Sequence, residues 1–535
     1  MTMKEGYRGR IPVEMLNFFR APGGHSLLIK GDAGTGKTTL ALQLIEELSD
    51  EQPDYYLSTR VSDEALYRQF PWLEEKAKRN DILKAGKAFL TKTKAPSFRG
   101  MEDYQHDSTL RVAKDLLKVL GKGESSSPMV VRSELMKLEG QIESGEGDDS
   151  EPMTGELTED GMVLDIGVML PEMELAYDMA EANLPNKTLI VLDSIDALSE
   201  HYGISSQKIM NTLQKDLVEH SGTNIAYVME TAEKNVYDYL GDGVVRLYNV
   251  QREGRRVREL VIEKLRGQMV MRWKYPFTLV DGRLRVFETN WFNMPNELLP
   301  HTPVADPSVE IASTGNGSMD KELGGLRRGS VILIEIGESV PQDIVRAIEY
   351  TLIADFLAKK RGIIWFPLFA INYETLDKHM RSMASKEALS GCLRVLDHDA
   401  PMDKSFDFVS IIEGSDAAQD LRLNSLRFML SRSAVEPYMS ILGFDSLEAL
   451  YGSDVLPATF VHLEAMKRAG NVVLAEATTS CKSLRQLAHQ ALIHIKLESL
   501  AGTVMVCGQK PSSPYYYLDF ELAKEKIVPR LVPMV

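Results

Sequence analysis

Short apolar runs alternate with amphipathic, helix-length segments along the first hundred residues. This alternation predicts an α/β fold with a mainly parallel sheet and flanking helices, because parallel strands need a crossover between them. Strands are predicted at 26–29 and 55–59, and helices at 39–45 and 63–78. Pro71 must start a new helix within the last segment or kink it.

The alternation is lost between about residues 96 and 161. The part at 139–160 is rich in Glu, Asp, Gly and Ser and contains no Lys or Arg. A stretch of this composition buries little apolar surface, so we expect a solvated insertion. A tolerated loop is the favoured interpretation, and a role in partner binding stays open.

Buried-strand patterns return at 188–192 and 224–229. Later runs separated by turns predict an antiparallel edge of the sheet, at 244–247, 257–263, 269–273 and 282–287. The proline-rich stretch 291–313 predicts a stiff linker. The first domain is therefore placed at 1–290 and the second at 314–535.

The second half of the chain repeats the first. Residues 24–30 align with 329–335, and residues 193–198 align with 445–450. The offset is 336 − 31 = 305 at the first match and 445 − 193 = 252 at the second, so the first copy carries 305 − 252 = 53 extra residues between them. Two tandem copies of one fold are predicted, and the insertion accounts for the extra residues.

A glycine-rich turn joins the first predicted strand to its helix with the spacing G-x-x-x-x-G-K-[ST]. Glycines allow backbone N–H groups and the helix N-terminus to point at phosphate oxygens. Lys37 is placed to reach the β and γ phosphates of ATP, and the Thr38 hydroxyl to bind Mg²⁺. The predicted nucleotide-binding residues are Gly31, Asp32, Ala33, Gly34, Thr35, Gly36, Lys37, Thr38 and Thr39.

Asp193 follows the apolar run 188–192, at the strand end where open α/β sheets bind ligands. With the phosphate loop, it is the second predicted Mg²⁺ residue, acting through water. An aspartate after a strand is also a common helix cap, so the assignment depends on the loop.

The second copy lacks these groups. Its loop has Pro341 in place of Gly36, Gln342 in place of Lys37 and Asp343 in place of Thr38. These changes remove a cation and a backbone N–H and add a carboxylate, so the second domain is predicted to be a degenerate pseudo-ATPase domain. Asp445 is then expected to be structural.

Composition limits the partners. The net charge is 61 − 77 = −16, which disfavours nucleic acid as a partner. The three cysteines lack metal-ligand spacing and are predicted to be buried thiols in a reducing compartment. The polar first ten residues and the lack of a membrane-length apolar run predict a cytoplasmic protein without membrane association.

Together these motifs resemble the RecA-like ATPases of the KaiC type, and among them the two-domain archaeal gas-vesicle regulators of the GvpD type. The segments that carry the resemblance are the phosphate loop, 192–198, 228–231, 243–247, 262–267 and 275–277, with 323–329 before the second copy. The resemblance covers nearly the whole chain except the insertion.

The resemblance implies a homo-oligomer, a ring that is often a hexamer, with ATP between subunits. It also implies that Lys264 and Arg266, a K-x-R pair, reach the neighbouring subunit's nucleotide. Cations supplied by a neighbour tie hydrolysis to assembly. The alternative, that both are ordinary strand-surface cations, is the less favoured.

One departure from the family concerns the catalytic base. The family carries a glutamate pair just past the second strand, where this chain has Arg60 and no carboxylate before Asp63 and Glu64. The leading hypothesis is therefore an ATP-binding regulatory protein with weak hydrolysis, whose nucleotide state controls assembly or a partner protein. The alternatives are a competent ATPase that uses Glu64 or Glu230 and, less favoured, a RecA-like DNA-dependent ATPase.

Overall fold

A computed structural model describes residues 10–58, 66, 68–72, 171–289, 292–398, 406–431, 433–520 and 527–535. The chain divides into two compact units. The first comprises Met1–Asn249, Glu259–Tyr275 and Asp281–Val286, and the second comprises Val250–Arg258, Pro276–Val280 and Phe287–Val535. The predicted insertion at 96–161 and Glu64 lie outside the described residues.

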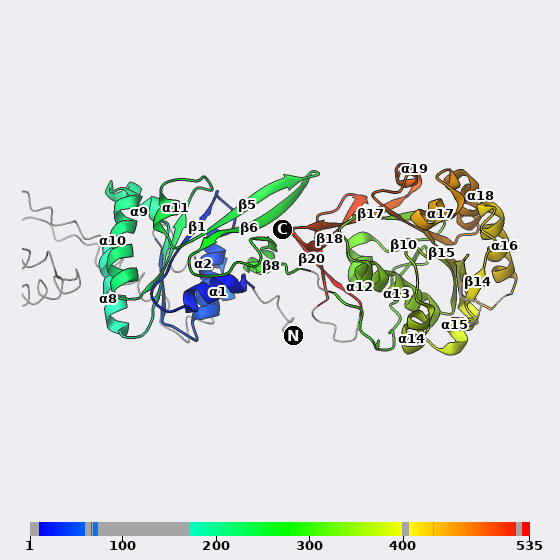
Figure 1. Ribbon diagram of the computed structural model, residues 1–535, viewed down its shortest axis with the longest axis horizontal. Coiled ribbons are helices and arrows are strands. Elements are labelled where there is room, and N and C mark those ends of the chain that lie inside the picture. Colours follow the sequence, from blue (N-terminus) through cyan, green and yellow to red (C-terminus); the bar gives the residue numbers. More distant parts are fainter. Residues whose placement is uncertain are drawn as a thin grey trace, which may run out of the picture. The chain divides into compact units, whose positions relative to one another are not determined.

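The first unit is built on an eight-stranded sheet with the order β2-β3-β4-β1-β5-β6-β7-β8 (Figure 1). The strands β2, β3, β4, β1 and β5 pair in parallel. The strands are β1 (Ser26–Gly31), β2 (Asp54–Ser58), β3 (Leu189–Asp193), β4 (Asn224–Met229), β5 (Gly243–Arg252), β6 (Arg255–Leu265), β7 (Lys274–Thr278) and β8 (Arg285–Val286). The predicted α/β class with a mainly parallel sheet is confirmed.

The helices of the first unit cover this sheet. They are α1 (Val13–Arg20), α2 (Lys37–Leu48), α8 (Pro171–Asn183), α9 (Ile195–Tyr202), α10 (Ser206–Leu213) and α11 (Tyr237–Leu240), with a π-helical turn at Gln214–His220 and a 3-10 turn at Val280–Gly282. Strand residues such as Ile190 and Ile225 pack with Leu198 of α9 and Met210 of α10 in one buried cluster. This core fixes the strand ends, from which the loops of the candidate site arise.

One predicted strand is wrong. Residues 269–273 are irregular, and the next strand, β7, begins at Lys274. Three of the apolar side chains of this run are exposed, with Met269 and Met271 at 77% and Trp273 at 61%. A short apolar run alone does not show whether a neighbouring element covers it.

The second unit contains a ten-stranded sheet with the order β14-β13-β12-β15-β16-β11-β17-β18-β19-β20, and β9 and β10 form a separate pair. The strands are β9 (Ile311–Ala312), β10 (Leu326–Arg327), β11 (Ser330–Ile336), β12 (Arg361–Phe366), β13 (Leu393–Asp397), β14 (Val409–Ile411), β15 (Val435–Gly443), β16 (Val472–Thr478), β17 (Ile493–Leu500), β18 (Thr503–Lys510), β19 (Tyr516–Asp519) and β20 (Arg530–Pro533). The strands from β14 to β17 pair in parallel, and those from β17 to β20 pair in antiparallel.

Helices cover both faces of the second sheet. They are α12 (Gly317–Leu323), α13 (Gln342–Ala358), α14 (Tyr373–Met383), α15 (Lys386–Cys392), α16 (Ala417–Leu430), α17 (Phe444–Tyr451), α18 (Val455–Arg468) and α19 (Leu484–Gln490). Ile332 of β11 faces the core with α13–α15, whereas the next residue, Leu333, faces the core with α16–α19. Figure 1 shows α13–α15 below the sheet and α17–α19 above it. Successive strand residues point to opposite faces, which explains the two cores.

The internal repeat is visible in the strand order. The run β12-β15-β16-β11-β17-β18-β19-β20 has the order of β2-β3-β4-β1-β5-β6-β7-β8 in the first unit. The second sheet adds β13 and β14 beyond β12. The two sheets are therefore versions of one topology, as the sequence predicts.

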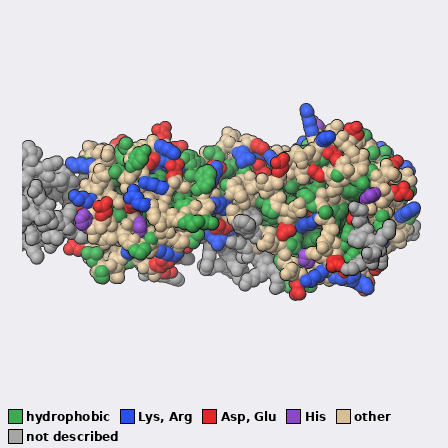
Figure 2. Space-filling model, viewed as in Figure 1, with side chains coloured by type: hydrophobic (Ala, Val, Ile, Leu, Met, Phe, Trp, Pro, Cys, Tyr) green, Lys and Arg blue, Asp and Glu red, His purple; other side chains and the backbone are tan. Residues whose placement is uncertain are grey.

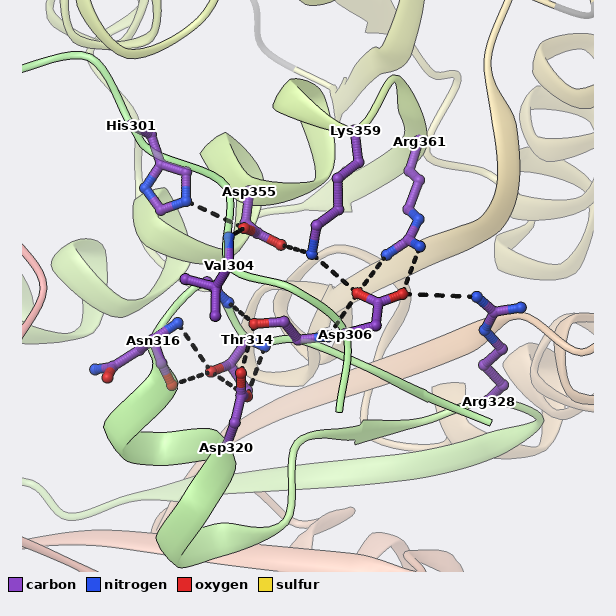
Figure 3. Close-up of polar contacts among 12 residues, drawn as sticks. His301, Val304, Asp306, Thr314, Asn316, Asp320, Arg328, Asp355, Lys359 and Arg361 are labelled. Atoms are coloured by element: carbon purple, nitrogen blue, oxygen red, sulfur yellow. Dashed lines mark hydrogen bonds and ion pairs between the residues drawn. The ribbon is translucent and has the colours of Figure 1, made fainter. Parts of the chain in front are cut away.

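Part of the proline-rich stretch is bound tightly within the second unit (Figure 3). Asp306 accepts hydrogen bonds from Lys359 at 2.9 Å and from Arg361 at 2.6 Å. His301 lies 3.2 Å from Asp355, which also pairs with Lys359 at 2.5 Å. Burial alone would raise the pKa of Asp306, but Arg361 and Lys359 hold this pKa far below its usual range. The predicted domain limits stay predictions.

Surface and core chemistry add three findings. No helix in the described ranges is long and apolar enough to cross a membrane. On the face drawn in Figure 2, acidic and basic side chains are interspersed among apolar ones. Cys392, Cys481 and Cys507 are free and buried, as predicted.

Candidate nucleotide-binding site

The predicted phosphate loop connects β1 to α2. Gly34 and Gly36 have φ angles of +74° and +105°, a region that favours glycine. The Thr35 hydroxyl donates to the Asp32 carbonyl at 2.8 Å, which closes the turn. Gly36 precedes α2 and has no side chain to cap the first turn, so the helix N-terminus is suited to an anion.

Lys37 is the first residue of α2, and its side chain is only 6% exposed. Its ammonium nitrogen donates to the Asp32 carbonyl at 2.9 Å and lies 3.4 Å from Oε2 of Glu230. The lysine is thus folded back over the loop. Phosphate oxygens entering the loop would compete with these two oxygens for the ammonium group, because they accept charge-assisted hydrogen bonds.

The Mg²⁺ residues predicted from the sequence meet directly. The Thr38 hydroxyl donates to Oδ2 of Asp193 at 2.7 Å, and the buried Tyr56 hydroxyl donates to the same oxygen at 2.6 Å. Burial raises the pKa of Asp193, and these two hydrogen bonds oppose the rise. A carboxylate beside a hydroxyl is the oxygen donor set that Mg²⁺ prefers, so the residues present fit the ion.

Glu230 follows β4 and is half-buried. Its backbone N–H donates to Asp196 of α9 at 2.5 Å, and the N–H of Gly31 donates to the carbonyl of Thr231 at 3.1 Å. The segment after β4 is therefore attached both to α9 and to the start of the phosphate loop. Glu230 and Lys37, named separately from the sequence, face each other.

A buried ion network holds the next part of this segment, residues 233–238. Lys30, the residue before the phosphate loop, is fully buried and donates to the Glu233 carbonyl at 2.6 Å and to Asp238 at 2.6 Å. Arg246 of β5 pairs with Asp238 and Glu263. Burial would raise the pKa of Asp238, but Lys30 and Arg246 lower it below its usual value. The network connects β1, β5, β6 and the segment 233–238.

Lys264 and Arg266 lie at the end of β6 and just past it. The Arg266 side chain is 67% exposed and pairs with Asp242 at 2.8 Å within its own chain. Burial lowers the pKa of Lys264. The predicted contact with a neighbouring subunit's nucleotide stays a prediction.

Sequence reasoning missed three residues of this site. Tyr56 lies in a predicted strand, but nothing in the sequence indicated that its hydroxyl reaches Asp193 at the end of the neighbouring strand β3. Asp196 belonged to a matched segment but was assigned no role. Lys30 looked like an ordinary strand residue, although a lysine in a buried central strand is a signal in itself.

In the second unit, α13 begins at Gln342, where the alignment with Lys37 places it. The Asp343 carboxylate accepts a hydrogen bond from the N–H of Met294 at 3.1 Å. Asp445 accepts bonds from the backbone and the hydroxyl of Thr478 at the end of β16. This structural role agrees with the prediction for Asp445.

The strand register, however, assigns a different residue of the second unit as the equivalent of Asp193. In the first unit, Asp193 and Ile29 both pair with Val228. The equivalent of Ile29 is Ile334, since 29 + 305 = 334, and it pairs with Glu476, which pairs in turn with Gly443. Gly443, and not Asp445, therefore occupies the position of the magnesium aspartate. The sequence alignment therefore placed the equivalent of Asp193 two residues too far along the chain, at Asp445.

Comparison with known proteins points to one group. Residues 15–263 match the family model described as GvpD gas vesicle protein, P-loop domain. Protein GvpD2 of Halobacterium salinarum is 24% identical to this chain over 525 residues, which cover 94% of this chain and 92% of that protein. Protein GvpD1 of the same organism is 24% identical over 369 residues, or 66% of this chain and 56% of that protein. The resemblance to GvpD-type proteins that the motifs predict is confirmed.

Proposed function

Because the chain is a GvpD-like P-loop protein, we propose that it binds ATP with Mg²⁺ in its first unit and acts as a nucleotide-dependent regulator. The geometry that supports this is the meeting of Lys37, Thr38 and Asp193 around a loop with an uncapped helix N-terminus. The matched family is described as a gas vesicle protein, so we propose gas vesicles as the setting in which the chain acts as a regulator.

In this proposal, binding outweighs turnover. Lys37 and the loop N–H groups hold the phosphates, and Thr38 and Asp193 hold the metal ion, whose positive charge offsets the charge of the β and γ phosphates. The attached segment 230–238 responds to what occupies the loop, because Lys37 and Glu230 are in contact before nucleotide arrives. Assembly into a ring, with Lys264 and Arg266 reaching the next subunit, would make the response cooperative.

The test is the substitution Lys37→Ala with the full chain. We expect at least about a hundredfold loss of ATP affinity, because charge-assisted contacts to the phosphates are removed. Lys208→Ala, at an exposed position of α10, is the matched control. Affinity is measured by isothermal titration calorimetry with Mg²⁺, and light scattering of the same samples reports assembly. An affinity for ATP in the Lys37 variant equal to that of the control would refute the proposal.

A competent ATPase is the second candidate, and the position of Glu230 favours it. Its carboxylate lies 3.4 Å from the ammonium group of Lys37, the residue that this proposal places against the β and γ phosphates. If Glu230 positions the attacking water, Glu230→Gln abolishes steady-state phosphate release and leaves ATP affinity within about threefold of the wild type. Unchanged turnover in this variant would exclude Glu230 from that role, and Glu64→Gln tests the other carboxylate named from the sequence.

A further inference from the structure

The carboxyl edge of the second sheet holds a pocket of about 320 Å³. It lies between the ends of β12 and β13, the chain that follows β12, and α17. Its volume is in the range of pockets that bind small organic molecules. All the residues that line the pocket belong to the second unit.

The topology explains why a pocket forms here. From β12 the chain continues outward to β13 and β14, and from β15 it continues in the opposite direction to β16. The strands β12 and β15 are neighbours and parallel, so the connections that leave their carboxyl ends diverge. Open α/β sheets bind their ligands at such a switch point.

Gly443 stands where the first unit has Asp193, and it also allows the chain after β12, residues 367–371, to form one wall of this pocket. A Cβ atom at Gly443 would lie 2.7 Å from the carbonyl carbon of Pro367 and closer still to the backbone of Leu368. Only glycine at this position allows the chain after β12 to approach the end of β15 so closely. The Ser446 hydroxyl then donates to the Leu368 carbonyl at 2.7 Å and holds the chain there.

A side chain of α13 holds the same wall in place. Arg346 of α13 donates to the carbonyls of Phe369 at 2.7 Å and Ala370 at 3.0 Å. Arg346 is itself paired with the buried Glu349 at 3.2 Å, and its guanidinium group lies 5.6 Å from the ring centre of Trp365. A wall fixed at both ends is pre-organised, which lowers the entropic cost of binding a ligand.

The lining indicates the chemistry of the ligand. Phe366, Phe369 and Leu450 supply an apolar, partly aromatic surface, and Asp397 supplies a carboxylate to which the Tyr373 hydroxyl donates. The described residues that line the pocket include one histidine, His398, but no Lys or Arg. A carboxylate beside aromatic rings attracts organic cations and repels phosphates.

We propose that the second unit binds a small organic cation, an amine or amidine with a flat apolar body, in this pocket. The ammonium group faces Asp397, and the apolar body lies against Phe366 and Leu450. The proposal does not depend on nucleotide binding in the first unit. It gives the degenerate copy a ligand of its own at the sheet edge where the first copy would hold nucleotide.

The experiment titrates the full chain with tryptamine and, as a matched anion, indole-3-propionate, by isothermal titration calorimetry. We expect saturable binding of tryptamine and at least about tenfold weaker binding of the anion, because only the amine makes a charge-assisted hydrogen bond to Asp397. Asp397→Asn keeps the shape and should remove most of this difference. Lys37→Ala should leave tryptamine binding unchanged, which separates this pocket from the nucleotide site.

A filled pocket supplies the second arm. Ala449 is an exposed position of α17 that lines the pocket, so Ala449→Trp blocks it without burying new bulk in the core. Leu430→Trp, at a 77% exposed position of α16, is the matched control. We expect the first variant to lose tryptamine binding and the second to keep it. The proposal is overturned if the folded wild type shows no saturable tryptamine binding up to about 10 mM, if Ala449→Trp binds normally, or if the anion binds as tightly as the amine.

Discussion

Tyr56 and Tyr55 are adjacent on β2 and offer a controlled test of the metal site. The Tyr56 hydroxyl donates to Asp193 at 2.6 Å, and Tyr56 is only 3% exposed. Tyr55 points to the other face of the sheet, where its hydroxyl accepts a bond from Asn183 at 3.0 Å. Tyr56→Phe therefore removes one bond to the carboxylate, and Tyr55→Phe removes one far from it.

The magnitude follows from the bond that is lost. A hydrogen bond to a charged group contributes about 1.5–3 kcal/mol, which corresponds to roughly a 10- to 100-fold change in an equilibrium constant. Burial already raises the pKa of Asp193, and the Tyr56 bond opposes that rise. Without the bond the pKa of Asp193 rises further, so protons compete better with Mg²⁺ for the carboxylate.

We therefore expect Tyr56→Phe to weaken ATP binding in Mg²⁺ by at least about tenfold and to leave binding in EDTA nearly unchanged. The penalty should grow as the pH is lowered, because burial raises the pKa of Asp193 and the loss of the Tyr56 hydrogen bond raises it further. Calorimetric titrations with and without Mg²⁺ at several pH values measure both effects, and Tyr55→Phe should show neither. An equal loss with and without Mg²⁺, or no loss at any pH, would refute the reasoning.

Two further predictions concern ion networks. Lys30→Met removes a fully buried cation that holds the segment 233–238, so we expect a loss of about 3 kcal/mol in the free energy of urea unfolding and faster hydrogen exchange in that segment, whereas Lys208→Met should have neither effect. Asp306→Asn breaks the cluster with Lys359 and Arg361. Because the folded-state pKa of Asp306 is depressed, its contribution to stability is complete above the unfolded value of about 4 and is lost as the pH falls below it. The variant should therefore melt at a lower temperature at pH 7, with a difference from the wild type that narrows toward pH 2 (~2 units below the unfolded value); a constant difference contradicts this account.

Local patterns were sufficient wherever local physics decides the outcome. The phosphate loop needs positive φ at Gly34 and Gly36 and a lysine at the start of the next helix, and these requirements are written in adjacent residues. The strand before Asp193 could be recognised from a run of apolar residues with a carboxylate at its end. Such signals do not depend on distant segments, so the sequence carries them directly.

Contacts between distant segments were outside the reach of such patterns. The short apolar run 269–273 predicted a strand, but Met269, Met271 and Trp273 are exposed and the run is irregular. The alignment chose Asp445 as the copy of Asp193, whereas the pairing of β15 with β16 places Gly443 there. Register depends on which strands pair, and a shift of two residues keeps the same face of the strand while moving a side chain along it.

The sequence by itself determined the α/β class, the tandem repeat, the phosphate loop and the loss of that loop in the second copy, because each is encoded in residues close together along the chain. Only the tertiary structure decided that Tyr56 and Thr38 share one oxygen of Asp193, that Lys37 faces Glu230, and that Gly443 lets the chain after β12 close over its strand. These arrangements join residues tens or hundreds of positions apart. They exist because parallel strands bring their carboxyl ends to one edge, where side chains without any local pattern in common become neighbours.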